Sequence, residues 1–206
     1  MPPRVIIAGA IAQHPIGGAG NTWAFLQYVL GFRALGCETY YFEEIDPQRC
    51  IAGDWSPASF ADSANGCHLS AVAARFGFDR QYALLSSEGG GHFGLSHADA
   101  ERIARDADLF VNISGRFHLR RILDAPRRRL YLDMDPGFVQ IWQQQYGVDM
   151  NLRGHDVHVT VGLNLGAADC PIPDCGVRWH TTLPPVVLSE WETEAPPGPA
   201  YTTVAD

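Results

Sequence analysis

The sequence predicts an α/β fold in which helices cover both faces of a doubly wound, mostly parallel sheet of about six or seven strands. Three observations carry this prediction. Short apolar runs alternate with helical segments, the runs are mostly continuous, and the first 45 residues read as strand, helix, strand. Strands that are buried on both faces have such continuous runs, as in a parallel sheet. The predicted architecture is therefore Rossmann-like.

The expected elements begin with a strand at residues 5–8, a glycine-rich loop, a helix over 21–35 that Gly36 ends, and a strand at 39–42. Four further apolar runs predict strands at 82–86, 109–113, 130–133 and 157–161. A helix is expected over residues 67–76. Residues 45–66 lack a regular pattern and predict either an excursion over the sheet edge or a loop that covers a substrate.

Two further helices have recognisable start signals. Ser96 and Asp99 form a capping-box-like start for a helix that runs to about residue 106. Asp135 followed by Pro136 predicts a cap and a first-turn proline for a helix over residues 137–146.

We expect one domain over residues 1–188, followed over 189–206 by a proline-rich linker and the start of a missing second domain. Residues 190–199 are acidic and rich in proline, and residues 201–204 read as the beginning of another strand. An apolar run after a linker, with nothing left to pack on, suggests that a second domain has been lost or cut away.

Composition excludes several classes of function. The net charge of −8 argues against nucleic acid as the main partner. All 15 basic residues are arginine, which excludes a Walker-type lysine, a pyridoxal Schiff base and a lysine nucleophile. No apolar run is long enough to cross a bilayer and no signal peptide is visible, so we expect a cytoplasmic protein without a membrane span. Three of the five cysteines are scattered, and Cys170 and Cys175 could form a disulfide or half of a metal site, but free thiols are expected.

The loop after the first predicted strand is the first candidate site. Seven residues separate Gly9 from Gly17, which does not fit the tight glycine turn of a dinucleotide fold. Gly17, Gly18 and Asn21 instead suggest a backbone that approaches an anionic group at the start of the first helix, although the glycines could serve only the turn. His14 in the same loop is a candidate general base, or an exposed loop histidine.

The ends of two later strands supply further candidates. Asp133 and Asp135 end a strand and could hold a metal ion together, but Asp135 is better explained as a helix cap. Asp133 remains a candidate for contacting a polar ligand or for orienting His14. Ser114 and Gly115 follow the neighbouring strand, where glycine would allow a ligand or a helix to approach. The histidines show no convincing zinc spacing, and His155 and His158 are expected to be structural.

Several of these segments resemble the N-terminal domain of GT-B-fold glycosyltransferases. The resemblance rests on the strand at 5–9, the glycine loop at 17–18, the helix that ends at Gly31, the segment 35–40 and the strand and loop at 108–115. In the family pattern "x-x-L-x-x-x-G-H-x-V", Cys37 replaces the histidine and Thr39 the valine.

The resemblance implies two Rossmann-like domains, of which this chain would be the one that mainly holds a small-molecule acceptor. The nucleotide-sugar donor would bind mainly to the other domain, and neither a cofactor nor a metal is expected. Inverting members use a loop histidine oriented by an aspartate, which would correspond to His14 and Asp133. Retaining members place the glycine loop near the donor phosphates, which would involve Gly17 and Gly18. The sequence does not decide between these two types or indicate the oligomeric state.

Three hypotheses follow. The first is the acceptor-binding half of a glycosyltransferase, inactive by itself. The second is a Rossmann-like module that binds a small ligand or a partner without catalysis. The third is a metal-dependent transferase that uses Asp133 and Asp135. The first requires that residues 10–20 form an open mouth above the parallel strands.

Overall fold

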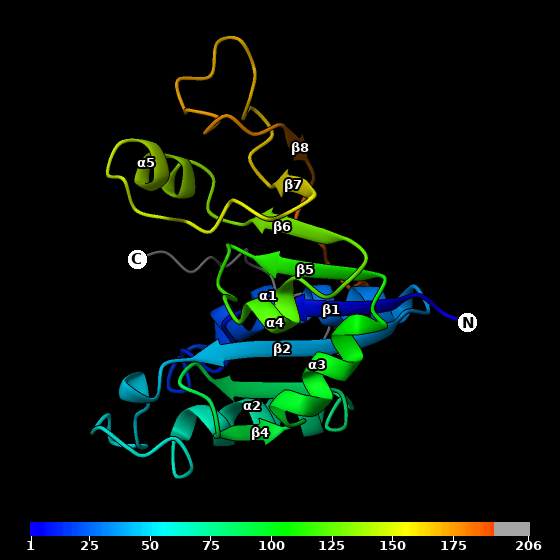
Figure 1. Cartoon of the computed structure of the whole chain (residues 1–206), viewed down its shortest axis with the longest axis vertical. Coiled ribbons are helices and arrows are strands. Elements are labelled where there is room, and N and C mark those ends of the chain that lie inside the picture. The colour runs from blue at the N-terminus through cyan, green and yellow to red at the C-terminus, as the bar shows by residue number, and fades with distance from the viewer. Residues whose placement is uncertain (192–206) are drawn as a thin grey trace, which may run out of the picture.

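The structure is a computed structural model that describes residues 1–191 (Figure 1). Its centre is an eight-stranded sheet in the order β4-β3-β2-β1-β5-β6-β7-β8, in which only the β3–β4 pair is antiparallel. The strands are β1 (Arg4–Ala8), β2 (Glu38–Ile45), β3 (Tyr82–Ser86), β4 (His92–Gly94), β5 (Leu109–Ile113), β6 (Arg129–Asp133), β7 (Val157–Thr160) and β8 (Trp179–Thr181).

The expectation of a mostly parallel α/β sheet is confirmed, but six or seven strands is too few. The two additional strands, β4 and β8, have three residues each. β4 lies in a glycine-rich segment that has no apolar run, so the sequence does not predict a strand there. Strands this short depend on the hydrogen bonds that a neighbouring strand offers, which local sequence does not reveal.

Helices cover both faces of the sheet, and the alternation of side chains along β1 shows how (Figure 1). Val5 and Ile7 pack with α1 (Ala19–Ala34) and α2 (Ala64–Arg75) on one face. Ile6 and Ala8 pack with α3 (His97–Arg105) and α4 (Arg120–Leu123) on the other. Each fully buried aliphatic side chain stabilises the fold by about 1.5–3 kcal/mol. This arrangement confirms the doubly covered sheet.

Side-chain caps set the starts of two helices. Ser96 Oγ accepts a hydrogen bond from the backbone N–H of Asp99 at 3.1 Å, as expected from the sequence. Helix α2 begins three residues before the expected Cys67, because Ser63 Oγ accepts from the N–H of Gly66 at 3.2 Å. Each such cap stabilises its helix by about 1 kcal/mol.

The predicted cap of α5 (Phe138–Gln144) is wrong. The N-cap residue is Gly137, with a φ of 94°, and Gln140 Oε1 accepts from its N–H at 2.7 Å. Asp135 contributes its backbone carbonyl, which accepts from the N–H of Phe138 at 3.1 Å. The carboxylate of Asp135 is thereby left for another role.

The chain returns to α1 after β8. The N–H of Val187 donates to Gln27 Oε1 at 2.6 Å, and the Trp191 ring lies 4.9 Å from that of Trp23. The expected boundary at residue 188 falls at the start of the short 3₁₀ helix η2 (Leu188–Trp191). The strand expected at residues 201–204 lies outside the described residues.

None of the helices within residues 1–191 combines the length and the apolar character needed to cross a membrane.

Candidate functional site

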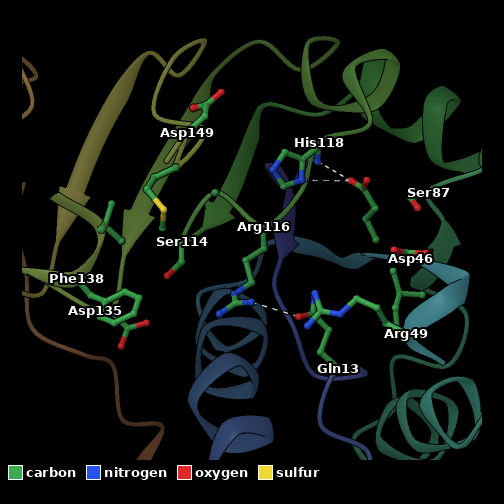
Figure 2. A pocket seen from close by; sticks show the side chains of 15 residues that line it. Gln13, Asp46, Arg49, Ser87, Ser114, Arg116, His118, Asp135, Phe138 and Asp149 are labelled. Atoms are coloured by element: carbon green, nitrogen blue, oxygen red, sulfur yellow. Dashed lines mark hydrogen bonds and ion pairs between the residues drawn. The ribbon is translucent and has the colours of Figure 1, made fainter. Parts of the chain in front are cut away.

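A cavity of about 450 Å³ opens at the carboxyl ends of the parallel strands (Figure 2). We call it the rim cavity. It lies where β1 and β5 are neighbours, which is the point where the strand order reverses and where ligands of doubly wound sheets bind. Its volume is in the range of small-molecule sites. Its lining includes Gln13, Glu44, Asp46, Arg49, Ser87, Ser114, Gly115, Arg116, His118, Asp135, Phe138 and Asp149.

The loop after β1 is fastened to the core at its beginning. Ala10, Ile11 and Ala12 are fully buried. The carboxyl group of Glu43 accepts hydrogen bonds from the N–H groups of Ala12 at 2.9 Å and Gln13 at 3.1 Å. These two bonds hold the point at which the chain leaves the core and reaches the cavity.

Glu43 is an unusual carboxyl group because no part of it reaches solvent. Burial raises its pKa to about 8, and the hydrogen bonds from Ala12, Gln13 and the Tyr41 hydroxyl only partly oppose that effect. The group is therefore mostly protonated at neutral pH. Glu43 Oε2 also lies 2.8 Å from the Tyr41 hydroxyl, which accepts a hydrogen bond from the N–H of Ile11 in the same loop.

The expected open mouth over residues 10–20 is only partly present. Residues 10–12 are packed into the core, so this part of the expectation is wrong. Gln13 is the member of the segment that lines the rim cavity. His14 is exposed at the next position and is not one of the lining residues.

The glycines and Asn21 have local structural roles. Gly17 has a φ of 71°, a conformation that glycine adopts most easily. A side chain at Gly18 would collide with the backbone of His14. Asn21 Nδ2 donates to the carbonyl of Ala10 at 2.8 Å. These contacts shape the loop, and the proposed phosphate contact at this loop stays a prediction.

Asp133 is a buried structural group. Its Oδ2 accepts from Gln140 Nε2 at 2.8 Å and from Thr160 Oγ1 at 2.9 Å, and its Oδ1 accepts from the N–H of Asp135 at 3.0 Å. Burial raises its pKa, and these bonds act against the rise. The carboxylate joins β6, β7 and α5, and no bond connects it with His14 among the described contacts. The contacts therefore give no support to Asp133 as the group that orients His14.

Asp135 takes the position that was expected of Asp133. It is exposed and lines the rim cavity. The two carboxylates do not converge, because strand β6 ends at Asp133 and the chain turns at once. The Asp-x-Asp metal pair stays a prediction, and the bonds of Asp133 to protein groups give it no support. Within residues 1–191 no three histidine, cysteine or acidic side chains are arranged to hold a metal ion.

The loop after β5 carries several lining residues and has a strained backbone. Ser114 has a φ of 51° and Gly115 a φ of 66°. A Cβ on Gly115 would lie 2.5 Å from the carbonyl oxygen of Met150 and 2.8 Å from the Tyr131 ring. Gly115 therefore permits close packing against the segment that follows α5, rather than only the approach of a ligand.

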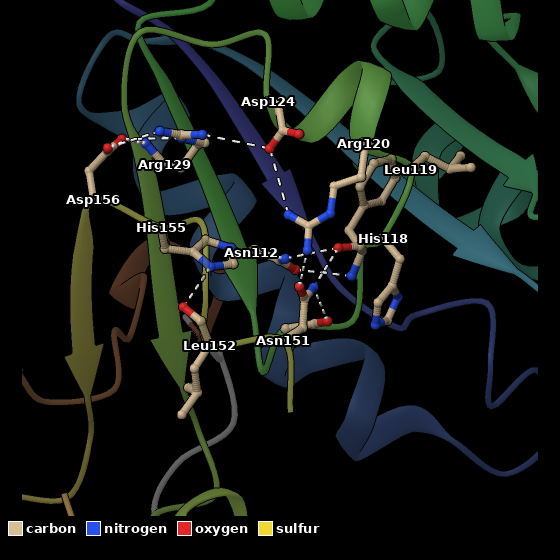
Figure 3. A network of polar contacts seen from close by, with 12 residues as sticks. Asn112, His118, Leu119, Arg120, Asp124, Arg129, Asn151, Leu152, His155 and Asp156 are labelled. Carbon is tan, nitrogen blue, oxygen red and sulfur yellow. Dashed lines mark hydrogen bonds and ion pairs between the residues drawn. The ribbon is translucent and has the colours of Figure 1, made fainter. Parts of the chain in front are cut away.

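Asparagines hold this loop in place (Figure 3). Asn112 donates to the carbonyl of Phe117 at 3.0 Å and accepts from the N–H of the same residue at 3.0 Å. Asn151 donates to the carbonyls of Gly115 at 2.9 Å and Phe117 at 3.0 Å, and accepts from Arg120 at 2.9 Å. The network fixes the backbone from which the cavity side chains project.

His118 lies in the rim cavity beside Glu44. Glu44 Oε2 accepts from the N–H groups of His118 at 2.5 Å and Leu119 at 3.1 Å, and lies 3.9 Å from His118 Nδ1. No motif in the sequence marks His118 as a site residue. The structure supplies the missing information by bringing β2 and the loop after β5 together.

The histidines of β7 and its approach are structural, as expected. His155 Nδ1 lies 3.3 Å and His158 Nε2 2.8 Å from the same carbonyl oxygen, that of Leu152. Burial lowers the pKa of His155 to about 4, so this imidazole is neutral at pH 7. The five cysteines, all within the described part of the chain, are free thiols.

A scan against protein-family models and a search of curated protein sequences both found no match, so the chemistry of the site is argued from its own geometry.

Proposed function

We propose that the chain is the acceptor-binding half of a GT-B-type glycosyltransferase and holds a small-molecule acceptor in the rim cavity. The sugar would come from a nucleotide-sugar donor, bound mainly by the second domain of the resembled family. The supporting observation is the position of the cavity at the switch point of the sheet, lined from five strand ends. A cytoplasmic location belongs to the same proposal.

The lining of the cavity suits a ligand with hydroxyl groups. The carboxylates of Asp135 and Asp149 can accept hydrogen bonds, and the hydroxyls of Ser87 and Ser114 can both donate and accept. Phe138 adds an aromatic surface at the edge of the cavity. This mixture of acceptors, two-way hydroxyls and one aromatic ring matches a sugar or another polyhydroxylated acceptor.

His118 is placed to act as the general base. Glu44 lies on the Nδ1 side of its ring, which leaves Nε2 for a substrate. In the proposed step the acceptor oxygen bonds to the anomeric carbon of the donor. The hydroxyl proton passes to His118, and the nucleoside diphosphate leaves with the bonding electron pair. His14, which the resemblance suggests, is the competing candidate.

The test begins with acceptor binding by the 206-residue chain. A panel of sugars and hydroxylated compounds is screened by saturation-transfer NMR on the chain and on Ser87→Trp, which fills part of the cavity. Ala71→Trp on the exposed side of α2 is the matched control. We expect binding by the chain and the control and its loss in Ser87→Trp. Tight binding of a nucleotide sugar by the chain alone would contradict the assignment as an acceptor half.

The second candidate is a module that binds a small ligand without catalysis. It is favoured by the contacts of Asp133, which are all internal, and by the position of His14 outside the rim cavity. When the donor-binding domain is supplied, loss of sugar transfer in His118→Gln with unchanged acceptor affinity would contradict this alternative. If sugar transfer is lost in His14→Gln but not in His118→Gln, the general base is His14.

A further inference from the structure

Two arginines from distant parts of the sequence line the same cavity. Arg49 belongs to the short 3₁₀ helix η1 (Pro47–Arg49) that follows β2, and Arg116 belongs to the loop after β5. Figure 2 shows both side chains reaching toward Gln13, which lies between them. Gln13 Oε1 accepts from Arg116 Nη1 at 3.2 Å. The fold therefore brings two positive charges into the rim cavity.

Neither guanidinium has a carboxylate within 4.0 Å among residues 1–191. This differs from Arg4 and Arg129, which form ion pairs at 2.9 and 3.0 Å. Within residues 1–191, the neutral Gln13 is the side chain to which Arg116 donates a hydrogen bond. Other arginines of residues 1–191 also lack an ion pair, and what distinguishes Arg49 and Arg116 is that both line the same cavity.

Two acidic side chains that line the same cavity, Asp46 and Glu44, accept hydrogen bonds from backbone N–H groups. Asp46 Oδ1 accepts from the N–H of Gln48 at 2.9 Å, where it caps η1. Glu44 Oε2 accepts from the N–H groups of His118 and Leu119. These bonds fix the short segments that carry the arginines, and neither carboxylate lies within 4.0 Å of the Arg49 or Arg116 guanidinium.

The charges in the rim cavity are also separated along its length. Asp135 and Asp149 lie on the side of α5 and Arg49 on the side of η1, with Arg116 between them and Asp46 beside Arg49 (Figure 2). A guanidinium presents several N–H donors in one plane and binds carboxylate or phosphate through paired hydrogen bonds. A ligand would therefore place an acidic group at the arginines and hydroxyl groups toward Asp135.

We propose that the rim cavity binds the anionic group, a carboxylate or a phosphate, of an acidic hydroxylated ligand between Arg49 and Arg116. The inference rests on the proposed function because it takes this cavity as the acceptor site. It adds that the acceptor is acidic. A diphosphate of the donor has the same chemistry, so the experiment separates these two sources.

The experiment measures affinities of the 206-residue chain by calorimetric titration. The probes are glucose 6-phosphate, glucuronate, glucose, inorganic phosphate and UDP. The variants are Arg49→Gln and Arg116→Gln, with Arg80→Gln as the matched control. Arg80 is exposed just before β3, at the opposite end of the strands. Amide NMR spectra establish that each variant is folded.

We expect an acidic sugar to bind at least about tenfold more tightly than glucose. Each cavity variant should weaken this binding by about tenfold or more, and Arg80→Gln should leave it unchanged. Higher salt should weaken acidic-sugar binding to the chain more than binding to the variants.

Three results would overturn the inference. The first is equal affinity for glucose and the acidic sugars, and the second is acidic-sugar binding unaffected by both cavity variants. The third is arginine-dependent binding of UDP but of no acidic sugar, which would assign the arginines to the donor. Failure to detect binding of any acidic probe to the chain would also overturn the inference.

The outcome separates the inference from the proposed function. Arginine-dependent binding of acidic sugars without any sugar transfer once the donor-binding domain is supplied would retain the anion site and refute the transferase. Transfer to a neutral acceptor, unchanged in both cavity variants, would retain the transferase and refute the anion site.

Discussion

Replacing Glu43 with glutamine should change how the stability of the protein depends on pH. The carboxyl group is fully buried, and burial raises its pKa from 4.5 to about 8. Below pH 4.5 it is protonated in both the folded and the unfolded chain. As the pH rises from 4.5 to 8, the unfolded chain releases a proton that the folded protein retains, so the free energy of unfolding falls.

The expected size follows from the pKa shift. One pKa unit corresponds to about 1.4 kcal/mol, so between pH 5 and pH 8 Glu43 should remove about 3–4 kcal/mol of stability. Glutamine resembles the protonated carboxyl group but does not titrate. Glu43→Gln also loses one of the two acceptors that hold the N–H groups of Ala12 and Gln13, which adds a cost that does not vary with pH.

Urea unfolding at pH 5, 6.5 and 8 measures the effect. The stability of the wild-type chain should fall relative to that of Glu43→Gln as the pH rises. Glu88→Gln, in the exposed loop after β3, is the control and should follow the wild type. A constant difference between the wild type and Glu43→Gln over this pH range would refute the reasoning, because it would mean that Glu43 titrates alike in both states.

Three further predictions concern stability measured by urea unfolding. Burial lowers the pKa of His155 to about 4, so the folded protein resists protonation and its free energy of unfolding should fall by about 2–3 kcal/mol as the pH falls from 6.5 to 4. His155→Gln should abolish this fall, and the same fall in the variant would contradict the prediction. Gly115→Ala should cost more than about 2 kcal/mol, whereas Gly36→Ala, also at positive φ but in open space, should cost only about 1–2 kcal/mol; equal costs would contradict the close packing at Gly115. Asp133→Ala should cost about 3 kcal/mol or more because two buried donors and one partly buried donor lose their acceptor, and a near-neutral effect would contradict the structural role of Asp133.

Much of the sheet could be predicted because its strands carry their signal locally. Six apolar runs coincide with six strands, and Ser96 caps α3 as its spacing with Asp99 indicated. The strands β4 and β8 could not be recognised, because three residues give no periodicity. Helix α2 starts early because Ser63 caps it. Serine is a common capping residue, but Ser63 lies within residues 45–66, which were expected to be irregular.

The candidate site was less predictable because its geometry depends on where strands end. Asp133 and Asp135 would share a side only if the strand continued past both, but β6 stops at Asp133. Asp133 therefore accepts hydrogen bonds from protein groups, and Asp135 is the aspartate that lines the rim cavity. Arg49 and Arg116 are 67 positions apart in the sequence, and only the order of strands in the sheet brings them to one cavity.

The most direct test of the rim cavity as the ligand site is a map of amide chemical-shift changes in the ¹⁵N-labelled chain during titration with an acidic sugar. The account predicts that the changes centre on Gln13, Arg49 and the loop from Ser114 to His118. Changes centred instead on the shallow hollow beside His155 and His180, or spread evenly over the surface, would contradict it.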